Sequence, residues 1–342
     1  MTTTFDFQDG AGPVPASRHI NPDGSVGGWV ADTASVAKTA YLGPDARVYG
    51  NACISDNASV YGNAHVYDDA HVYDDAHVFG KAWVFHNAKV YGNACISGAV
   101  RIYGNAKVYD YAQVYGTARV FGNAQIYDTA HIYDDARVYG DARVYDKAYV
   151  SGAARVYDKA KISGNAYISG HAYVFGHGRV SDNADVFGRA RVFGNAQIYG
   201  KAHVYGHARV FHNARIYGYA RVYDNIYVYD TAQIYGKACV SGNTWVYGNA
   251  CVSGNACVYG NACICSNARV TSNTNFMAST YKYDWTLTLD GDDQEPYLQY
   301  GCERHSVKHW LANVKEIVDK HEETPEHVTV IFALCQASKA LK

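Results

Sequence analysis

A six-residue spacing of branched apolar residues constrains this chain more than any other feature of its sequence. From Val30 to Val270 every sixth residue is Val, Ile or Leu, which makes 41 positions without an insertion or a deletion. The residue two places before each is nearly always Ala, at 36 of the 40 positions from Ala34 to Ala268. The exceptions are Val100, Gly178, Ile226 and Thr244. A period this strict indicates a repeat architecture.

The chemistry of the repeat unit, most often Ala-x-Val-Tyr-Gly-Asn, predicts one short strand followed by one turn. Side chains alternate between the two faces of a strand, so only Val points inward in x-Val-Tyr. Gly, Asn and Asp accept the backbone angles of a corner, and Ala is small enough to lie inside it. Three units therefore make a triangular coil, and the repeat would form about 14 coils stacked about 4.8 Å apart.

This pattern resembles the hexapeptide-repeat family of left-handed β-helices. The resemblance implies left-handed coiling, which periodicity alone does not give. Within the family, the chain is similar to phage and prophage proteins and to the bacterial YdcK-like group. Those proteins often open with a stretch like residues 21–34 and close with a module like residues 297–305. The resemblance implies no established activity, and it makes a phage origin an expectation.

Changes of composition at both ends of the repeat predict three parts. Residues 1–29 are irregular and rich in Gly and Pro from Gly10 to Gly28, as expected of an N-terminal cap over the open edge of a solenoid. Residues 30–276 form the repeat. All six Glu of the chain lie in residues 277–342, which we expect to fold as a small α/β C-terminal domain. The fold class is therefore an all-β solenoid, a left-handed parallel β-helix with a small α/β module.

Within the C-terminal module, Trp285–Leu289 and Tyr297–Tyr300 have the character of strands. Ser306 is expected to be the N-cap of a helix. The apolar residues that follow have helical spacing: Val307, Trp310, Leu311, Val314, Ile317 and Val318. A final apolar segment, Val328 to Leu341, is either strand or helix.

One face of the predicted coil has an unusual outer surface. Residues 18 apart stack, so each outward position becomes a ladder along the solenoid. On this face the position after the core residue is aromatic in 12 successive coils, and the position before it is Arg in seven of the same 12. The candidate binding face comprises Arg101, Arg119, Arg137, Arg155, Arg191, Arg209, Tyr103, Phe121, Tyr139, Tyr157, Phe175 and Phe193.

Both a structural and a functional interpretation fit this face. Stacked aromatics stabilise a ladder by about 0.2–1 kcal/mol per pair, and Arg over an exposed ring adds about 0.5–1 kcal/mol. Arg with aromatics is also the composition of protein-binding hot spots and of single-strand or polyanion sites. Asp at neighbouring corners, such as Asp135 and Asp141, weakens the nucleic-acid alternative. We predict a non-catalytic scaffold that presents this face to a protein partner or to itself, with polyanion binding as an alternative.

A further alternative is a trimeric acyltransferase, because many hexapeptide-repeat proteins have that activity. The family resemblance implies a catalytic His and a loop projecting from the helix. This repeat has no inserted loop, although catalytic residues tend to lie on loops held by a rigid scaffold. His65, His71 and His77 point from three different faces. We therefore expect no catalytic residues and no cofactor.

Two groups of Cys and His were considered as metal or disulfide sites. The spacing of Cys302, His305 and His309 suits zinc, but a fourth ligand would be needed, such as Cys335 or water. We expect no metal there. Cys239 and Cys257 stack on neighbouring coils at a distance that permits a disulfide, and two free thiols are the expected state.

The bulk properties give broad expectations about location and assembly. The net charge is −2, so no overall field favours nucleic acid. The sequence has no apolar run long enough to span a membrane and no recognisable signal peptide. Its nine Cys follow no disulfide pattern. We expect a cytoplasmic protein, in the host cytoplasm if a phage encodes it, and a homo-oligomer such as a trimer by analogy.

Overall fold

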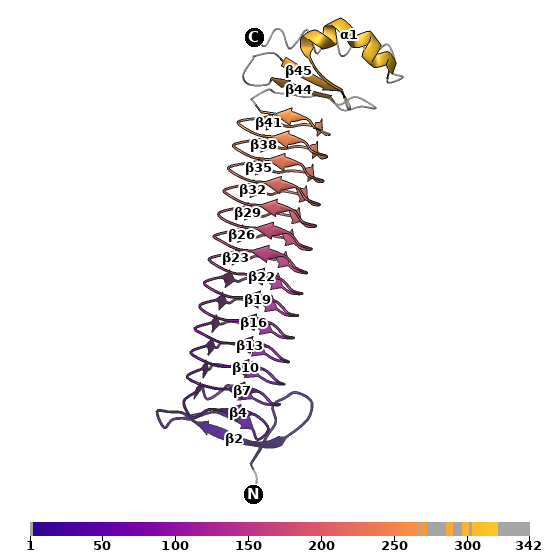
Figure 1. Ribbon diagram of the computed structural model, residues 1–342. Helices are drawn as coiled ribbons and strands as arrows, with labels where there is room; N and C mark the ends of the chain where they lie inside the picture. The colour runs from indigo at the N-terminus through magenta and orange to yellow at the C-terminus, as the bar shows by residue number, and fades with distance from the viewer. Residues whose placement is uncertain (1–2, 266, 272–284, 290–295, 301–302, 321–342) are drawn as a thin grey trace. The chain divides into compact units, whose positions relative to one another are not determined.

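The computed structural model describes residues 3–265, 267–271, 285–289, 296–300 and 303–320 (Figure 1). The chain divides into two compact units, residues 1–194 and residues 195–342. Among the described residues, the fold is a parallel β-solenoid with one helix near the C-terminus. The solenoid expected from the sequence is confirmed, while left-handed coiling stays a prediction of the resemblance.

The repeat appears as a series of two-residue strands at six-residue steps. In the first unit they run from β4 (Ser35–Val36) to β30 (Arg191–Val192), and in the second from β31 (Gln197–Ile198) to β43 (Arg269–Val270). Three strands make one turn, which gives about 13 turns against the 14 or so expected. The difference arises because the first repeat, with Val30, lies in the longer strand β3 (Val26–Ala31), which also pairs with an N-terminal strand.

Each strand contains one outward residue and one core residue. The core residues from Leu42 to Val252 are at most 1% exposed, as the period predicts. The corner residues from Ala40 to Ala250 are also buried, because the chain turns tightly around them. Thr244, one of the four exceptions at the Ala position, is buried with its hydroxyl donating to the carbonyl of Ser241 at 2.7 Å. The exception is therefore tolerated because its polar atom is satisfied.

Strands 18 residues apart pair in parallel and form three sheets in the first unit. Sheet I contains β3 and every third strand from β6 (Arg47–Val48) to β30, and sheet II runs from β4 to β28 (Arg179–Val180). Sheet III runs from β5 (Tyr41–Leu42) to β29 (Asp185–Val186). Figure 1 shows successive strands of sheet II stacked from β4 to β22 (Arg143–Val144). In the second unit β33 (Arg209–Val210), β31 and β32 (His203–Val204) begin the corresponding three series.

The corners depend on residues that accept a positive φ. Gly98 has a φ of 81°, and a Cβ added to it would lie only 2.6 Å from the carbonyl oxygen of Gly116. Asp134 occupies an equivalent corner with a φ of 56°, and its carboxylate accepts a hydrogen bond from the N–H of Gly152 at 3.0 Å. Gly accepts this φ because it has no Cβ, and Asp accepts it with a short side chain that also bonds to the next coil. Gly and Asp therefore share this position.

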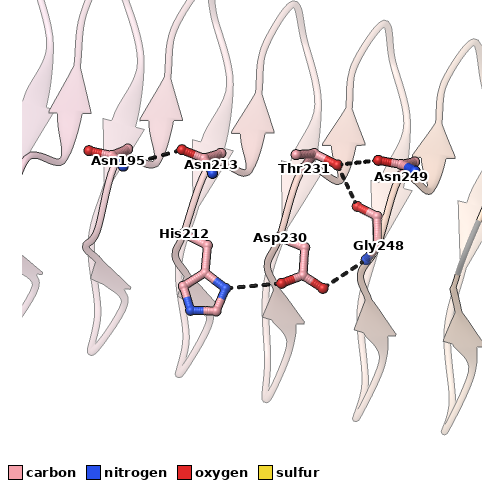
Figure 2. A network of polar contacts seen from close by, with 7 residues as sticks. All are labelled: Asn195, His212, Asn213, Asp230, Thr231, Gly248 and Asn249. Atoms are coloured by element: carbon pink, nitrogen blue, oxygen red, sulfur yellow. Dashed lines mark hydrogen bonds and ion pairs between the residues drawn. The ribbon is translucent and has the colours of Figure 1, made fainter.

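A second corner position, three residues before the core residue of sheet II, carries a row of side-chain hydrogen bonds that we call the corner amide ladder. Asn105 Nδ2 donates to Asn123 Oδ1 at 3.2 Å, and Asn123 Nδ2 donates to Asp141 Oδ1 at 2.9 Å. Such bonds tie each corner to the next coil. In the second unit the ladder comprises the pairs Asn195–Asn213 and Thr231–Asn249 (Figure 2), together with the pair Asn249–Asn267.

The N-terminal segment is more regular than the sequence suggested. β1 (Thr4–Phe5), β2 (Val14–Ile20) and β3 pair antiparallel, where an irregular segment was expected. Phe7 is buried and stacks on Tyr49 of the first coils at 4.8 Å, and Arg47 Nη1 donates to the carbonyl of Phe7 at 3.2 Å. The strands were missed because backbone pairing, rather than an apolar alternation, forms them.

The described part of the C-terminal module contains three antiparallel strands and one helix. β44 (Trp285–Leu289) and β45 (Pro296–Tyr300) confirm the two expected strands, and β46 (Glu303–Ser306) adds a third. Helix α1 spans Val307–Lys320.

The helix begins as the sequence predicts. The N–H of His309 donates to Ser306 Oγ at 3.2 Å, which confirms Ser306 as the N-cap. Val307, Trp310 and Val314 are buried on one side of the helix. The segment from Val328 to Leu341 lies outside the described residues.

We predict that the solenoid interior is sensitive to the loss of a single side chain. Val120→Ala removes two buried methyl groups from β18 (Arg119–Val120) and should lower the free energy of unfolding by about 2 kcal/mol. Gln113→Ala changes an outward residue of β17 (Gln113–Val114) and should shift stability by less than about 0.5 kcal/mol. Urea denaturation followed by circular dichroism compares the two, and equal shifts would contradict the inward assignment of Val120.

Candidate interaction face

Four arginines from consecutive coils lie in register on sheet I, and we call them the arginine column. They are the outward residues of β15 (Arg101–Ile102), β18, β21 (Arg137–Val138) and β24 (Arg155–Val156). Each is the direct cross-strand partner of the next. Neighbouring strands lie about 4.8 Å apart, so the column places four like charges within about 15 Å. Of the other predicted arginines, Arg191 lies on β30 in the first unit and Arg209 on β33 in the second.

Beside these arginines, the residues that follow the core positions of sheet I form an aromatic column from Tyr49 to Phe193. Successive ring centroids are 4.7 to 4.9 Å apart, and the planes are tilted by at most 11°. The column includes the six predicted aromatics, Tyr103, Phe121, Tyr139, Tyr157, Phe175 and Phe193. In the second unit Phe211, Tyr229 and Tyr247 stack at 5.0 Å.

Aromatic stacking is not confined to sheet I. Sheet II carries a column of five tyrosines, from Tyr73 to Tyr145, with ring centroids 4.8 to 5.0 Å apart. Stacked rings therefore serve as a general means of holding coils together in this solenoid. The arginine column is the feature that distinguishes sheet I.

The arginines differ in what holds their side chains. The guanidinium of Arg101 lies over the ring of Trp83, 5.2 Å from its centroid. Those of Arg155 and Arg191 both lie over the ring of Tyr173, 5.4 and 5.5 Å from its centroid. Arg119 and Arg137 have neither an ion-pair partner nor a ring beneath them among the residues that the structure describes. The two arginines in the middle of the column are thus half-buried but held by neither a carboxylate nor a ring in that part of the chain.

The same two arginines line a half-open depression of about 360 Å³ on the surface of the first unit. Its walls are Thr117, Arg119, Asp135, Arg137, Ala153 and Arg155. Asp135 accepts a hydrogen bond from the hydroxyl of Thr117, which holds this carboxylate at the edge of the column. The depression is therefore positively charged overall but is not purely cationic.

Burial changes the titration of groups at the start of the aromatic column. Burial, reinforced by the carboxylate of Asp68 and opposed by Arg101, raises the pKa of Tyr67 to about 12. Burial and the neighbouring Arg47 lower the pKa of His65 to about 4. Both shifts keep the side chains neutral at physiological pH, as expected of groups that pack rather than react.

The other residues considered from the sequence do not form a site in the described part of the chain. Cys239 and Cys257 are cross-strand neighbours, and both are free thiols. The rings of His305 and His309 stack at 4.3 Å, while Cys302 lies outside the described residues. Those residues contain no cluster of three or more metal-ligating side chains. No helix among them is long and apolar enough to cross a membrane.

Sequence reasoning missed a second group of cations, on sheet II. Arg143, Lys161 and Arg179 are consecutive cross-strand partners, and they line a depression together with Lys159 and His177. The signal was present in the 18-residue spacing of positions 143, 161 and 179. It was hidden because two of the five residues belong to a corner rather than to a strand.

We predict that Tyr67 contributes to a loss of stability in alkaline solution. Below pH 10 the phenol is protonated in both the folded and the unfolded chain. Between about pH 10 and 12 the unfolded chain loses this proton first, so the stabilisation fades as the pH rises. Tyr67→Phe keeps the stacked ring and should flatten this fall in thermal melts at increasing pH. Tyr111→Phe, at a 62% exposed position, is the control, and an unchanged slope in Tyr67→Phe would refute the assignment.

Comparison with known proteins supports the repeat architecture. Six segments match the family model of the YdcK beta solenoid repeat: residues 100–116, 112–128, 130–146, 136–152, 202–218 and 232–248. Together they cover about a quarter of the chain. Comparison with curated proteins gives no match. Similarity to the wider hexapeptide-repeat family and to phage proteins stays a prediction. Over the six matched segments the chain is similar to the YdcK solenoid repeat, in agreement with the β-solenoid that its strands form.

Proposed function

We propose that the chain is a non-catalytic scaffold that presents sheet I to a protein partner or to a second copy of itself. The observation that carries the proposal is the arginine column lying beside the aromatic column. The proposal includes assembly as a homo-oligomer in the cytoplasm and, from the family resemblance, a phage origin. It concerns the surface of the solenoid, because the interior is filled by Val, Ile and Ala side chains.

Electrostatics favour an occupant on this surface. Unit charges about 4.8 Å apart repel by about 1 to 3 kcal/mol per pair at effective dielectric constants of about 80 to 20. The repulsion along the arginine column recurs at three successive steps. A surface bearing carboxylates would relieve it, and Arg offers them paired hydrogen bonds.

The composition of the face also favours a protein occupant. Interfaces are enriched in Arg, Tyr and Trp and depleted in Lys. The outward strand residues of sheet I include six Arg and no Lys, whereas those of sheet II include Lys89, Lys107 and Lys161. Trp83 is 38% exposed beside Arg101, so a large apolar side chain lies at one end of the arginine column.

The uninterrupted strands support a scaffold over an acyltransferase. Between β4 and β43 the strands follow at six-residue steps, so no loop projects from the described coils. An acyltransferase site would have to be built on the flat faces alone. A coenzyme A titration that releases heat and saturates would argue for the enzyme instead.

Polyanion binding is the second candidate, favoured by the depression that Arg119, Arg137 and Arg155 line. Asp135 in the wall of this depression weighs against a phosphate backbone. Salt separates the two candidates, because binding that neutralises several phosphates weakens steeply as salt rises.

We predict that Arg119→Ala with Arg137→Ala lowers the mass of the assembly measured by light scattering after size exclusion. The two arginines have no partner to lose in the described part of the chain, so the melting temperature should stay unchanged or rise slightly as repulsion falls. The ratio of absorbance at 260 and 280 nm, with and without nuclease, reports bound nucleic acid.

Lys89→Ala with Lys107→Ala is the matched control, because it removes two cross-strand cations from sheet II. We expect the control to keep the wild-type mass. A wild-type monomer, or an assembly that both double variants retain, would count against self-association through sheet I. A mass that falls on nuclease treatment would instead favour the polyanion candidate.

A further inference from the structure

The depression on sheet II of the first unit gathers positively charged side chains in its wall. It has a volume of about 390 Å³, and its walls include Arg143, Lys159, Lys161, His177 and Arg179. The only carboxylate in its wall is that of Asp141. The wall of the depression therefore contains four permanently positive side chains and one carboxylate, and its volume is in the range of small-ligand sites.

Strand register brings three of these cations together. Arg143 is the cross-strand partner of Lys161, and Lys161 is that of Arg179. Lys161 is half-buried between two exposed arginines. The row is bounded on one side by neutral Gln125, the cross-strand partner of Arg143. The row of charge thus spans three neighbouring strands, about 10 Å from first to last.

The adjoining corner departs from its own structural rule at the same place. The corner amide ladder runs from Asn105 through Asn123 to Asp141, and the next two positions of this corner are Lys159 and His177. Neither of these two makes the ladder bond that Asn makes elsewhere, as in Asn195–Asn213 of the second unit (Figure 2). Where Lys159 and His177 replace Asn, the corner loses the stabilising hydrogen bonds of the ladder and gains basic side chains. Such local departures from a regular pattern are typical of functional sites.

A third departure lies next to the row of cations, outside the wall of the depression. The tyrosine column of sheet II ends at Tyr145, and Ser163 and Ser181 occupy the next two positions. Each Ser lies two residues after Lys161 or Arg179, on the same outward side of the sheet. Small hydroxyl side chains thus replace large rings beside the row of cations and offer additional hydrogen-bond donors.

The cations are not neutralised by the protein in the part that the structure describes. None of the four makes an ion pair there. The carboxylate of Asp141 is already engaged, since its Oδ1 accepts the hydrogen bond from Asn123. An anion from outside the chain would therefore meet donors that have no competing internal acceptor.

We propose that this depression binds a compact oligophosphate, an anion with two or three linked phosphate groups. Arg143 and Arg179 would each grip a terminal phosphate through paired N–H donors, and Lys161 would lie between them as a point charge. Lys159 would contact the anion from the corner at the edge of the depression. The row spans three strands and ends at Gln125, which fits a short ligand better than a continuous polymer. The site lies on sheet II and goes beyond the proposed role of sheet I.

The test is calorimetric titration of the full-length protein with sodium tripolyphosphate, without divalent metal. We expect saturable binding with one site per chain, and orthophosphate weaker by at least about tenfold because it can meet fewer of the donors. Lys161→Gln should weaken tripolyphosphate binding by at least about tenfold. The double variant Lys159→Asn with His177→Asn should weaken it as well, while its melting temperature stays equal or rises because Asn can extend the corner amide ladder.

The matched control is His71→Asn with Lys89→Asn, which makes the same two changes at cross-strand neighbours elsewhere on sheet II. It should bind tripolyphosphate like the wild type. Absence of saturation at about 1 mM would overturn the proposal. Equal weakening in the control would overturn it too, because the attraction would then be general. A single-stranded oligonucleotide that competes as well as tripolyphosphate would show a polymer track rather than a compact site.

Discussion

Parallel pairing between strands 18 residues apart is the constraint on which the rest of this structure depends. The N–H of Arg119 donates to the carbonyl of Ala136 at 2.9 Å, and that of Phe121 donates to the carbonyl of Val138 at 3.0 Å. An insertion of one residue would shift this register and turn the following core residues outward. Coils of constant length therefore explain both the buried apolar interior and the repetition of every outward position as a ladder.

The same constraint decides how much could be predicted from the sequence. The inward Val, the corner Ala and the Gly or Asp of the turns follow from the period, and the structure places them as expected. Ser306 was recognisable as a helix cap because the apolar spacing after it is helical. Strand β46 could not be recognised from the sequence, because Glu303–Ser306 contains no apolar residue. This segment is a strand through its pairing with β45. Strands β1 and β2 escaped for a similar reason.

The candidate face shows the same division between repeated and local features. The arginine column could be read at 18-residue intervals, because all of its members occupy one position of the repeat. The hydrogen bond from Thr117 to Asp135 could not, because the 18-residue spacing places these two residues on neighbouring coils but does not fix the direction of their side chains. The cations of sheet II were missed because Lys159 and His177 occupy a different repeat position from Arg143 and Arg179. Residues at two positions of a repeat become neighbours only when the corner is built in space.

A solenoid of identical coils has a particular difficulty in making a site, since every rung resembles the next. Stacked aromatic rings on sheets I and II and amide bonds at the corners stabilise the coils wherever they occur, so their presence does not mark a location. One part of the surface differs from the rest only where residues do not make these stabilising contacts. Lys159 and His177 forgo the corner bonds, and Ser163 and Ser181 interrupt the rings, within the same few rungs. Arg119 and Arg137 lie beside the unbroken aromatic column, but their like charges repel each other. Both places thus combine a local cost with an unmet charge, which sets them apart from a ladder that only supports the fold and is the reason for proposing recognition there.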